Sequence, residues 1–451
     1  MQGGEEMDLP KSAENILRRY EENGFYAYAV GGFVRDSLMG RECADIDIAT
    51  SALPEETKRI FHDVKIIPTG EKHGTLTLVA DNRSVEVTTF RIESEYSDSR
   101  HPDSVCFTES IRDDLSRRDF TVNAMALGIS GEIVDPFGGK RDIELRLIRC
   151  VGDAEERFRE DPLRILRALR FCSVLGFEPE KTTLEAALKT KALLSKVSRE
   201  RMFAELVKLL CGEYAGKVIE EHWEIISEVI PELSACHGFL QNTPYHIYDV
   251  LVHTAKAVDG VPREPILRLA AFFHDIGKPL CYSEDENGVG HFHSHSKQSA
   301  RIAQERLTAL KAPSKTVCEV TELCRYHDYL VEPNEPQVLR ALNKFGELTF
   351  RRLLAIKRGD ENAKSSICKC RIEMLGNVET VLDCLIKRRE CFSLKQLKID
   401  GNDLVAMGIP EGKEIGAILN TLLSEVMEKR IENDKDVLLK RGAEIFGRKP
   451  Q

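Results

Sequence analysis

The chain has 451 residues, of which 42% are hydrophobic and 31% charged, and its formal net charge is −10. This length exceeds what one hydrophobic core serves and predicts two to four domains. The acidic balance argues against indiscriminate binding of nucleic acid, but not against a local basic groove.

The N-terminal segment, the apolar runs and the cysteines bear on the cellular compartment of the protein. The N-terminal segment MQGGEEMDLP is acidic and polar, which is atypical of a signal or transit peptide. No apolar run reaches the roughly 18 residues that a membrane-spanning helix needs. Thirteen cysteines are scattered without the spacing of a disulfide framework, so we interpret them as reduced thiols. We therefore expect a cytoplasmic protein that does not bind membranes.

The first part of the chain mixes strands and helices. Alternating or β-branched runs bounded by glycines and polar turns predict strands at residues 27–30, 45–50, 75–80 and 85–90. From residue 154 onward helical periodicity takes over. We expect helices at residues 160–177, 182–197, 198–210 and, with one apolar face, 415–427. The sequence thus predicts an α/β head followed by a long all-helical body.

Two acids in the second predicted strand are candidates for a metal site. Asp45 and Asp47 are two residues apart, so both carboxylates project from one face of the strand while Ile46 and Ile48 face a core. Adjacent carboxylates repel each other unless a cation lies between them, and oxygen ligands of this kind suit Mg²⁺. An isolated Asp-x-Asp is more often a solvated turn, so the pair alone does not decide the question.

Neighbouring residues favour the metal site. Gly31 and Gly32 follow the first strand and would let backbone N–H groups approach a phosphate. Arg35, three residues later, is placed to neutralise that phosphate. Glu86, on a later strand, could complete a two-metal site that activates a hydroxyl and stabilises pyrophosphate as it leaves. The combination is typical of nucleotidyl transfer.

The segment GGFVRDSLMGRECADIDIAT, residues 31–50, resembles the signature of the class II nucleotidyltransferases. These are the tRNA CCA-adding enzymes and bacterial poly(A) polymerases of the polymerase-β-like superfamily. The resemblance continues in order through PTGEKHGTLTLV (68–79), RRDFTVNAMAL (117–127), VDPFGGKRDI (134–143), RFREDPLRILRALRF (157–171) and SRERMFAEL (198–206). It implies a polymerase-β-like α/β (α+β) head with a small mixed sheet, and the 3′ end of tRNA, CTP and ATP as substrates.

The resemblance also implies roles for individual residues. Asp45 and Asp47 would hold the catalytic Mg²⁺, and Asp119 would support a turn. Nucleotide-binding roles fall on Gly32, Arg35, Arg118, Asp161, Arg164, Arg167 and Arg170. Base selection is chemically reasonable, because a carboxylate accepts from the exocyclic amine shared by cytosine and adenine while an arginine donates to ring acceptors. By itself, however, the segment 161–170 could equally be a salt-bridged, solvated helix face.

Three activities occur on this scaffold: full CCA addition, partial addition (CC-only or A-only), and poly(A) tailing. Residues 90–107, which include RHPDSV, keep a loop that CC-adding members tend to lack. The C-terminal tail is mixed in charge, whereas bacterial poly(A) polymerases usually carry a basic extension. We therefore expect CCA addition, and the sequence leaves A-only addition open.

A second group of residues lies in the helical body. His274 and Asp275 end an apolar run, and such a pair is most often a hydrogen-bonded structural one. Further histidines and carboxylates in order suit a transition metal or Mg²⁺ that activates water for phosphoester hydrolysis. The pattern resembles an HD-superfamily phosphohydrolase, which implies His253, His274, Asp275 and Asp360 as core ligands and His295 and His327 as ligands of a second metal. Asp328 is the reserve for Asp360, and His291 and His293 are expected in a solvated loop.

We expect four domains: a nucleotidyltransferase head at 1–152, a base-recognising helical neck at 153–215, an HD-type body at 216–365 and a tRNA-binding helical tail at 366–451. In some CCA-adding enzymes an HD domain carries phosphatase or 2′,3′-cyclic phosphodiesterase activity, which the resemblance extends to this body. A rival interpretation makes the HD body the working enzyme and the head an RNA-binding module. A third is an RNA-binding scaffold that consumes no CTP.

Overall fold

The computed structural model describes residues 9–43, 45–80, 83–93 and 105–447. The chain divides into two compact units, each described by itself below. The first comprises residues up to Ser234 together with Ala309–Lys311, and the second comprises Ala235–Thr308 and the residues from Ala312 onward. Among the described helices, none is long and apolar enough to cross a membrane.

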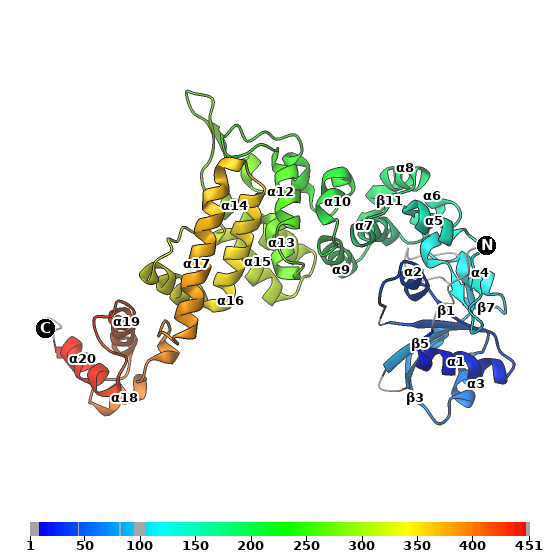
Figure 1. The fold of residues 1–451 in the computed structure, drawn as a ribbon, viewed down its shortest axis with the longest axis horizontal. Coiled ribbons are helices and arrows are strands. Elements are labelled where there is room, and N and C mark those ends of the chain that lie inside the picture. The colour runs from blue at the N-terminus through cyan, green and yellow to red at the C-terminus, as the bar shows by residue number, and fades with distance from the viewer. Residues whose placement is uncertain (1–8, 44, 81–82, 94–104, 448–451) are drawn as a thin grey trace. The chain divides into compact units, whose positions relative to one another are not determined.

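A seven-stranded mixed sheet forms the head of the first unit (Figure 1). Its strands lie in the order β3 Lys65–Gly70, β4 Thr75–Ala80, β5 Arg83–Thr89, β2 Asp47–Thr50, β1 Ala27–Val30, β8 Ala126–Leu127 and β9 Ile133–Val134. β2 and β5 run parallel, whereas the other neighbouring pairs are antiparallel. The predicted α/β head with a small mixed sheet is confirmed.

Alternation of apolar and polar residues fixes which face of the sheet is buried. Ile46 and Ile48 are buried, whereas Asp45 and Asp47 are exposed, as the period of two predicts. Helix α1, Lys11–Glu22, packs its apolar side onto the same core through residues such as Leu17. β2 begins at Asp47, so Asp45 precedes the strand that the sequence predicted from residue 45.

Helices and short strands complete the first unit. They are α2 Gly32–Leu38, α3 Pro54–Ile60, β6 Arg91–Glu93, β7 Val105–Phe107, α4 Ile111–Ser116, α5 Gly139–Leu145, β10 Leu147–Ile148, α6 Ala154–Glu160, α7 Leu163–Leu175, β11 Glu178–Pro179, α8 Lys181–Thr190, α9 Arg199–Leu210, α10 Ala215–Glu221 and α11 Trp223–Ile226. The helix expected from residue 160 begins at Leu163, because Glu160 closes α6 and Pro162 precedes the first turn of α7. Asp161 therefore lies at the break between the two helices.

The second unit is mainly helical. Its helices are α12 Val250–Asp259, α13 Pro265–Phe273, α14 His295–Ala309, α15 Ser314–Tyr326, α16 Glu335–Asn362, α17 Lys369–Lys387, α18 Gly401–Ala406, α19 Lys413–Met427 and α20 Lys435–Gly447. A hairpin, β12 Tyr282–Glu284 and β13 Gly290–Phe292, interrupts the helical run and carries His291. The predicted helical body is confirmed, and this hairpin is an addition to it.

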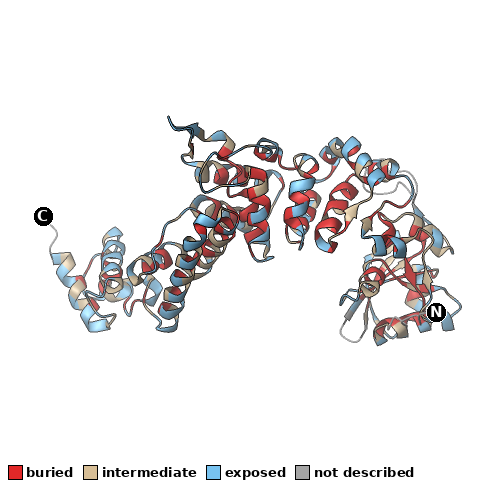
Figure 2. Cartoon of the chain, turned by 45° about the horizontal axis from the view of Figure 1, so that its top comes forward, coloured by how far each residue is buried: buried red, intermediate tan, exposed pale blue. Residues whose placement is uncertain are grey.

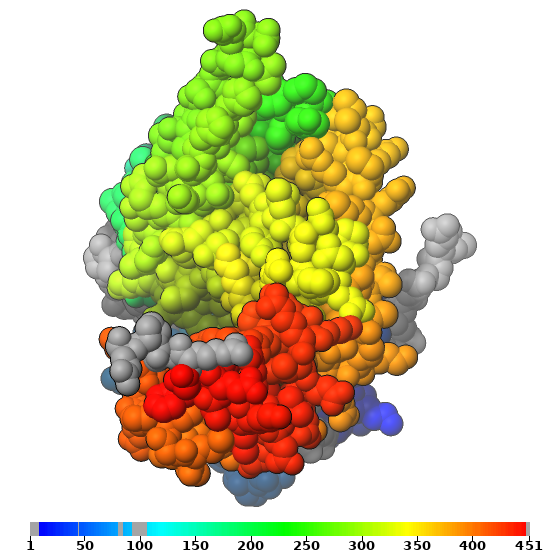
Figure 3. All heavy atoms as spheres, turned by 90° about the vertical axis from the view of Figure 1, so that its left-hand side faces the viewer, coloured from blue at the N-terminus to red at the C-terminus, as the bar shows by residue number. Residues whose placement is uncertain are grey.

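Amphipathic faces hold these helices together. Buried residues line one side of most helices and exposed residues the opposite side (Figure 2). One apolar cluster joins α16 and α17, and a second joins α18, α19 and α20 through residues such as Leu404, Leu422 and Leu438. The predicted amphipathic helix at 415–427 is confirmed as α19. In the space-filling view the red atoms of α19 and α20 form an outer surface (Figure 3).

Candidate active site and candidate metal centre

The sheet brings the head acids and the glycine turn to one place. Gly31 adopts a φ of 71°, which links the end of β1 directly to the start of α2 at Gly32. A Cβ added at Gly31 would lie 3.0 Å from an Arg118 guanidinium nitrogen, so Arg118 packs closely against this turn. Asp47 and Glu86 are register partners on the parallel strands β2 and β5. Three motifs far apart in sequence therefore meet at the strand ends.

A cavity of about 600 Å³ opens at this point of the first unit. Eight arginines line it against four acids, Asp47, Glu86, Asp119 and Asp161, leaving four formal positive charges that match a nucleoside triphosphate. The expected residues found in its lining are Gly32, Arg35, Asp47, Glu86, Arg118, Asp161, Arg164, Arg167 and Arg170. Asp45 is not part of this lining and is exposed just before β2.

The carboxylates in the cavity are chemically suited to a metal ion. Asp47 and Glu86 are exposed to the cavity, yet the surrounding protein removes part of their hydration. This desolvation, together with the charge of Asp45, raises the pKa of Asp47 above its ordinary value against an opposing effect of Arg118. Desolvation and the nearby Asp47 likewise raise the pKa of Glu86, partly offset by Arg91. Like charges crowded in this way favour either a proton or a cation. Oxygen donors of this kind fit Mg²⁺, so these residues pass the test for such a site.

Arg35 is held by two partners that the sequence analysis did not identify. Its guanidinium donates to Asp36 Oδ1 at 2.9 Å and Oδ2 at 2.8 Å, and to Asn123 Oδ1 at 2.6 Å. Asn123 in turn donates to Asp119 Oδ1 at 3.2 Å. Burial raises the pKa of Asp119, but Arg167, which contacts its Oδ2 at 2.6 Å, and other donors bring it below the usual value. The arginines are thus oriented by a buried network before any nucleotide binds.

The expected base-reading residues also have partners in the structure. Asp161 accepts from Arg201 at 2.7 and 3.3 Å and caps the start of α7 through Leu163 N–H at 3.1 Å. Arg164 donates to Glu160 Oε2 at 2.6 Å and to the main-chain carbonyl of Arg117 at 3.2 Å. Because Arg201 lies 40 residues from Asp161, only the folded chain shows that it contacts the expected base reader.

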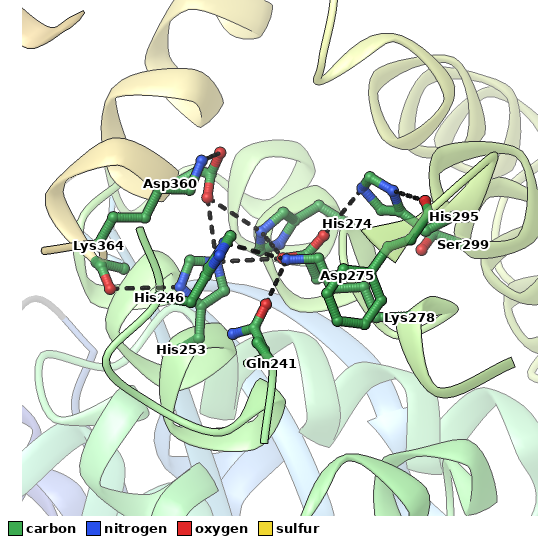
Figure 4. Close-up of polar contacts among 12 residues, drawn as sticks. Gln241, His246, His253, His274, Asp275, Lys278, His295, Ser299, Asp360 and Lys364 are labelled. Atoms are coloured by element: carbon green, nitrogen blue, oxygen red, sulfur yellow. Dashed lines mark hydrogen bonds and ion pairs between the residues drawn. The ribbon is translucent and has the colours of Figure 1, made fainter. Parts of the chain in front are cut away.

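In the second unit, four buried side chains converge as the sequence analysis expected (Figure 4). His253 comes from α12, His274 and Asp275 follow α13, and Asp360 comes from α16. His253 Nε2 lies 3.2 Å from Asp275 Oδ2 and 3.1 Å from Asp360 Oδ1. Among the described residues, His253 Nε2, His274 Nε2, Asp275 Oδ1 and Asp360 Oδ1 are buried without a hydrogen-bond partner. Buried polar atoms usually have a partner, and the nitrogen and oxygen atoms of these four residues fit a divalent metal.

A second group shares one carboxylate with the first. Asp275 Oδ1 lies 3.3 Å from His295 Nε2 and 3.7 Å from His327 Nε2. The two imidazole nitrogens are 3.2 Å apart. Asp328 Oδ2 lies 3.2 Å from His295 Nε2, so Asp328 accompanies this second group, while Asp360 belongs to the first. Asp275 therefore belongs to both groups of candidate ligands, each of which could hold a cation.

The imidazoles are oriented as metal ligands. Each Nδ1–H donates to a main-chain carbonyl, which leaves Nε2 with a lone pair facing the cluster. The distances are 3.3 Å for His253, 2.7 Å for His274, 2.9 Å for His295 and 2.8 Å for His327. Without a cation, the carboxylates of Asp275 and Asp360 outweigh the effect of burial and raise the pKa of His274 to about 10.

Two lysines stand beside the acids, and the sequence analysis missed both. Lys278 Nζ lies 2.6 Å from Asp275 Oδ2 and also donates to Gln241 Oε1 at 2.7 Å. Lys364 Nζ donates to Asp360 Oδ2 at 2.7 Å (Figure 4). Both line a cavity of about 320 Å³ that reaches the cluster. Cations, acids and imidazoles at the end of a small cavity suit a phosphate ester.

Comparison with known proteins shows the family to which the chain belongs. The family model of the poly A polymerase head domain matches residues 27–149, that of the RNA and SrmB-binding site of polymerase A matches 176–236, and that of tRNA nucleotidyltransferase domain 2 matches 291–441. The CCA-adding enzyme of Lactobacillus helveticus is 33% identical over 439 residues, which cover 96% of each protein. The chain belongs to the CCA-adding enzyme family. Members are metal-dependent nucleotidyltransferases.

Other relatives agree with this assignment. The CCA-adding enzyme of Geobacillus thermodenitrificans is 50% identical over 209 residues, and here the chain spans about half the relative's length, 51%, with 46% of its own. A crystal structure of the Bacillus stearothermophilus CCA-adding enzyme in complex with CTP superposes with a TM-score of 0.71 at 30% identity, covering 96% of this chain and 97% of that one. The Thermotoga maritima CCA-adding enzyme complexed with tRNA shares the fold, with a TM-score of 0.56 at 22% identity over 98% of this chain and 97% of that one.

Proposed function

We propose that the protein adds the 3′-terminal CCA to tRNA without a nucleic-acid template, using CTP and ATP and releasing pyrophosphate. The observation that carries this proposal is the arginine-rich cavity that also contains Asp47 and Glu86. One pocket thereby combines a cradle for phosphates, a site for a divalent cation and polar groups for reading a base. The family relatives support the choice of tRNA as acceptor.

The chain's own residues would act as follows. Gly32 and Arg35 bind the phosphates of the incoming nucleotide, and Arg118 adds charge beside them. Asp161 accepts from the exocyclic amine of cytosine or adenine, and Arg164 donates to a ring acceptor. Arg167 and Arg170 line the same cavity beside Asp161 and Arg164 and add positive charge. The 3′-hydroxyl oxygen of tRNA attacks the α-phosphorus, the bond to the pyrophosphate oxygen breaks, and the hydroxyl proton is lost.

Asp45, Asp47 and Glu86 would hold Mg²⁺ in this pocket. When bound, the ion supplies charge neutralisation at the α-phosphate and lowers the pKa of the attacking hydroxyl. Glu86 is included because it is the register partner of Asp47. The two aspartates keep the roles expected from the sequence, and the position of Asp47 in the cavity wall supports its part most directly.

The domain boundaries and the cellular location are also part of this proposal. The head at 1–152, the neck at 153–215, the HD-type body at 216–365 and the tail at 366–451 stay predictions, with the tail assigned to tRNA binding. We place the protein in the cytoplasm. The loop at 90–107, which favours full CCA addition over partial addition, lies mostly outside the described residues. A-only addition and poly(A) tailing are the alternatives to be separated by product analysis.

The direct test is incorporation of labelled CTP into a tRNA transcript that ends at the discriminator base, with Mg²⁺. The unchanged protein should incorporate label and release pyrophosphate, whereas Asp47→Asn should lose both. The variant should still bind the transcript, measured as RNA retained in a filter-binding assay, because the substitution removes no positive charge. Incorporation at the same rate by both proteins would contradict the proposal.

A second function is proposed for the other unit: a metal-dependent phosphohydrolase of the HD type. The four buried, unsatisfied donor atoms of His253, His274, Asp275 and Asp360 favour it. His295, His327 and Asp275 would hold a second ion, with Asp328 beside them. The bound ions, Mg²⁺ or a transition metal, would supply an activated water. The expected substrates are phosphomonoesters or 2′,3′-cyclic phosphates.

This second function can be tested independently of the first. His274→Ala in the full-length protein should abolish stoichiometric binding of Mn²⁺ to the second unit and any hydrolysis of phosphoesters. CCA addition should continue, because the head has its own acids. If the variant retains the Mn²⁺ stoichiometry of the unchanged protein, the assigned ligands are wrong. If hydrolysis is the only activity of the unchanged protein, the interpretation of the head as an RNA-binding module replaces the leading proposal.

A further inference from the structure

An aromatic side chain stands at the mouth of the HD cavity with a guanidinium against its ring. Tyr245 lines the same cavity as Lys278 and Lys364 and is 42% exposed. Arg371, from α17, places its guanidinium carbon 4.8 Å from the centre of the Tyr245 ring. Neither residue belongs to the cluster of expected metal ligands. A planar ring backed by a guanidinium is a surface on which a nucleobase can stack.

The loop that carries Tyr245 is fixed in place. Ser365 donates its N–H to the Tyr245 carbonyl at 2.8 Å and its hydroxyl to the Pro244 carbonyl at 3.3 Å. The Thr243 hydroxyl lies 2.7 Å from His246 Nδ1, which closes a turn within the loop. The main chain at Tyr245 is thus held in place, and Arg371 packs against the ring, so less ordering is left to a ligand and the entropic cost of stacking is lower.

A chain of ion pairs connects the Tyr245 ring with the expected metal ligands. Arg371 lies 3.5 Å from Glu361 Oε1, and the same carboxylate oxygen accepts from Lys364 at 3.1 Å. Lys364 contacts Asp360, the expected metal ligand, at 2.7 Å. Glu361 is buried and joins both cations. The distance between the ring and the cluster is therefore set by packed charges and not by a free loop.

The size of the cavity limits what can occupy it. At about 320 Å³ it lies at the small end of ligand pockets, and it suits one nucleotide unit better than a base-paired end. The lining also includes His291 and His293, whose rings stack with an interplanar angle of 7° and centroids 5.7 Å apart. A phosphate near the lysines and a base near Tyr245 would fill the space from end to mouth.

We propose that Tyr245, backed by Arg371, is the specificity-determining platform of the HD cavity, which stacks the base of a nucleoside phosphate whose phosphate group lies at Lys278 and Lys364. This inference rests on the proposed phosphohydrolase function of the same site. It makes a base-bearing phosphate the preferred ligand over a phosphate ester of similar charge that lacks a base. A purely structural Tyr245–Arg371 contact would stabilise the loop without creating that preference.

The test compares adenosine 3′-monophosphate with glycerol 2-phosphate, by calorimetric titration of the full-length, Mn²⁺-loaded protein. Binding that disappears in His274→Ala is assigned to the HD cavity, which separates it from nucleotide binding by the head. Tyr245→Ala should weaken this binding of the nucleotide roughly 5- to 150-fold, the range of one base stacked on an aromatic ring, and leave glycerol 2-phosphate within about twofold. Tyr245→Phe should restore the nucleotide affinity.

The matched control is Tyr248→Ala. Tyr248 lies in the same segment and also packs against a cation, Lys256 at 4.9 Å, but it is not part of the cavity lining. The control should leave both affinities unchanged. Equal losses for both probes in Tyr245→Ala, or no loss for either, would overturn the platform while leaving the phosphohydrolase intact. Absence of any His274-dependent binding of either probe would overturn both.

Discussion

Substitution of Arg201 by alanine tests how Asp161, the carboxylate proposed to read the base, is oriented. Arg201 contacts Asp161 through two nitrogens, at 2.7 and 3.3 Å. The exposed fractions of the two side chains are 25% and 15%, so the pair is neither a solvated surface bridge nor fully buried. Once Arg201 is removed, the Asp161 carboxylate can rotate away from the position in which it accepts from an exocyclic amine.

The expected magnitude lies between two limits. Exposed ion pairs contribute about 0–1 kcal/mol, whereas breaking a fully buried pair costs about 3–5 kcal/mol. Hydrogen bonds to charged groups contribute about 1.5–3 kcal/mol, which suits this intermediate burial. If most of the energy of the Arg201–Asp161 contact contributes to nucleotide choice, the preference of Arg201→Ala for CTP over UTP should fall by roughly 10- to 150-fold.

The assay is single-turnover addition to a tRNA transcript ending at the discriminator base, with CTP or UTP as the only nucleotide. Arg199→Ala is the matched control, because Arg199 is exposed on the same helix, two residues away. The control should keep the preference of the unchanged protein. Unchanged discrimination in Arg201→Ala would refute the reasoning, as would an equal loss in the control.

Asn123→Ala removes a carboxamide that bridges a buried arginine and a buried aspartate, so the free energy of unfolding by urea should fall by about 2 kcal/mol and the KM for CTP should rise; an unchanged KM would contradict the proposed positioning role. Asp161→Ala should relax the choice between C or A and the other nucleotides while phosphoester hydrolysis continues; unchanged selectivity would contradict base reading by this carboxylate. A pH series can be run on protein from which metal has been removed by a chelator. Burial alone would lower the pKa of His274, but the carboxylates of Asp275 and Asp360 raise it from 6.5 to about 10. Its protonated form therefore stabilises the fold fully below pH 6.5, and this contribution is lost as the pH rises through about 10, while Mn²⁺ affinity rises over the same interval. Urea midpoints that increase with pH in chelated protein would contradict this sign.

Local patterns predicted the residues of the head site better than their supporting contacts. The period of two identified Asp45 and Asp47 as one polar face, and the glycine pair indicated the turn that precedes α2. The pairing of Asp47 with Glu86 depends on the register of two parallel strands, which the sequence pattern does not determine. Asn123 and Arg201 lie within motifs of the resemblance, but their contacts are not readable from the motifs, because Asn123 meets Arg35 across 88 residues and Arg201 meets Asp161 across 40.

The second site shows the same division. Ordered histidines and aspartates sufficed to predict which four side chains converge, and the structure brings all four together, while their role as metal ligands stays a prediction. The position of Asp360 beside His253 is set by the packing of α16 against α12, and Asp328 meets His295 across 33 residues of sequence. Lys364 was missed because a lysine four residues after an aspartate is ordinary on any exposed helix. Its significance comes only from burial at the cluster.

The central claim is that this chain builds CCA on tRNA. The most direct measurement incubates transcripts ending at the discriminator base, at -C and at -CC with Mg²⁺ and each labelled nucleotide, and then sequences the products. We expect all three transcripts to be completed to CCA and extension to stop there. Extension of only the -CC transcript by one A, a long A ladder, or no incorporation would each contradict it.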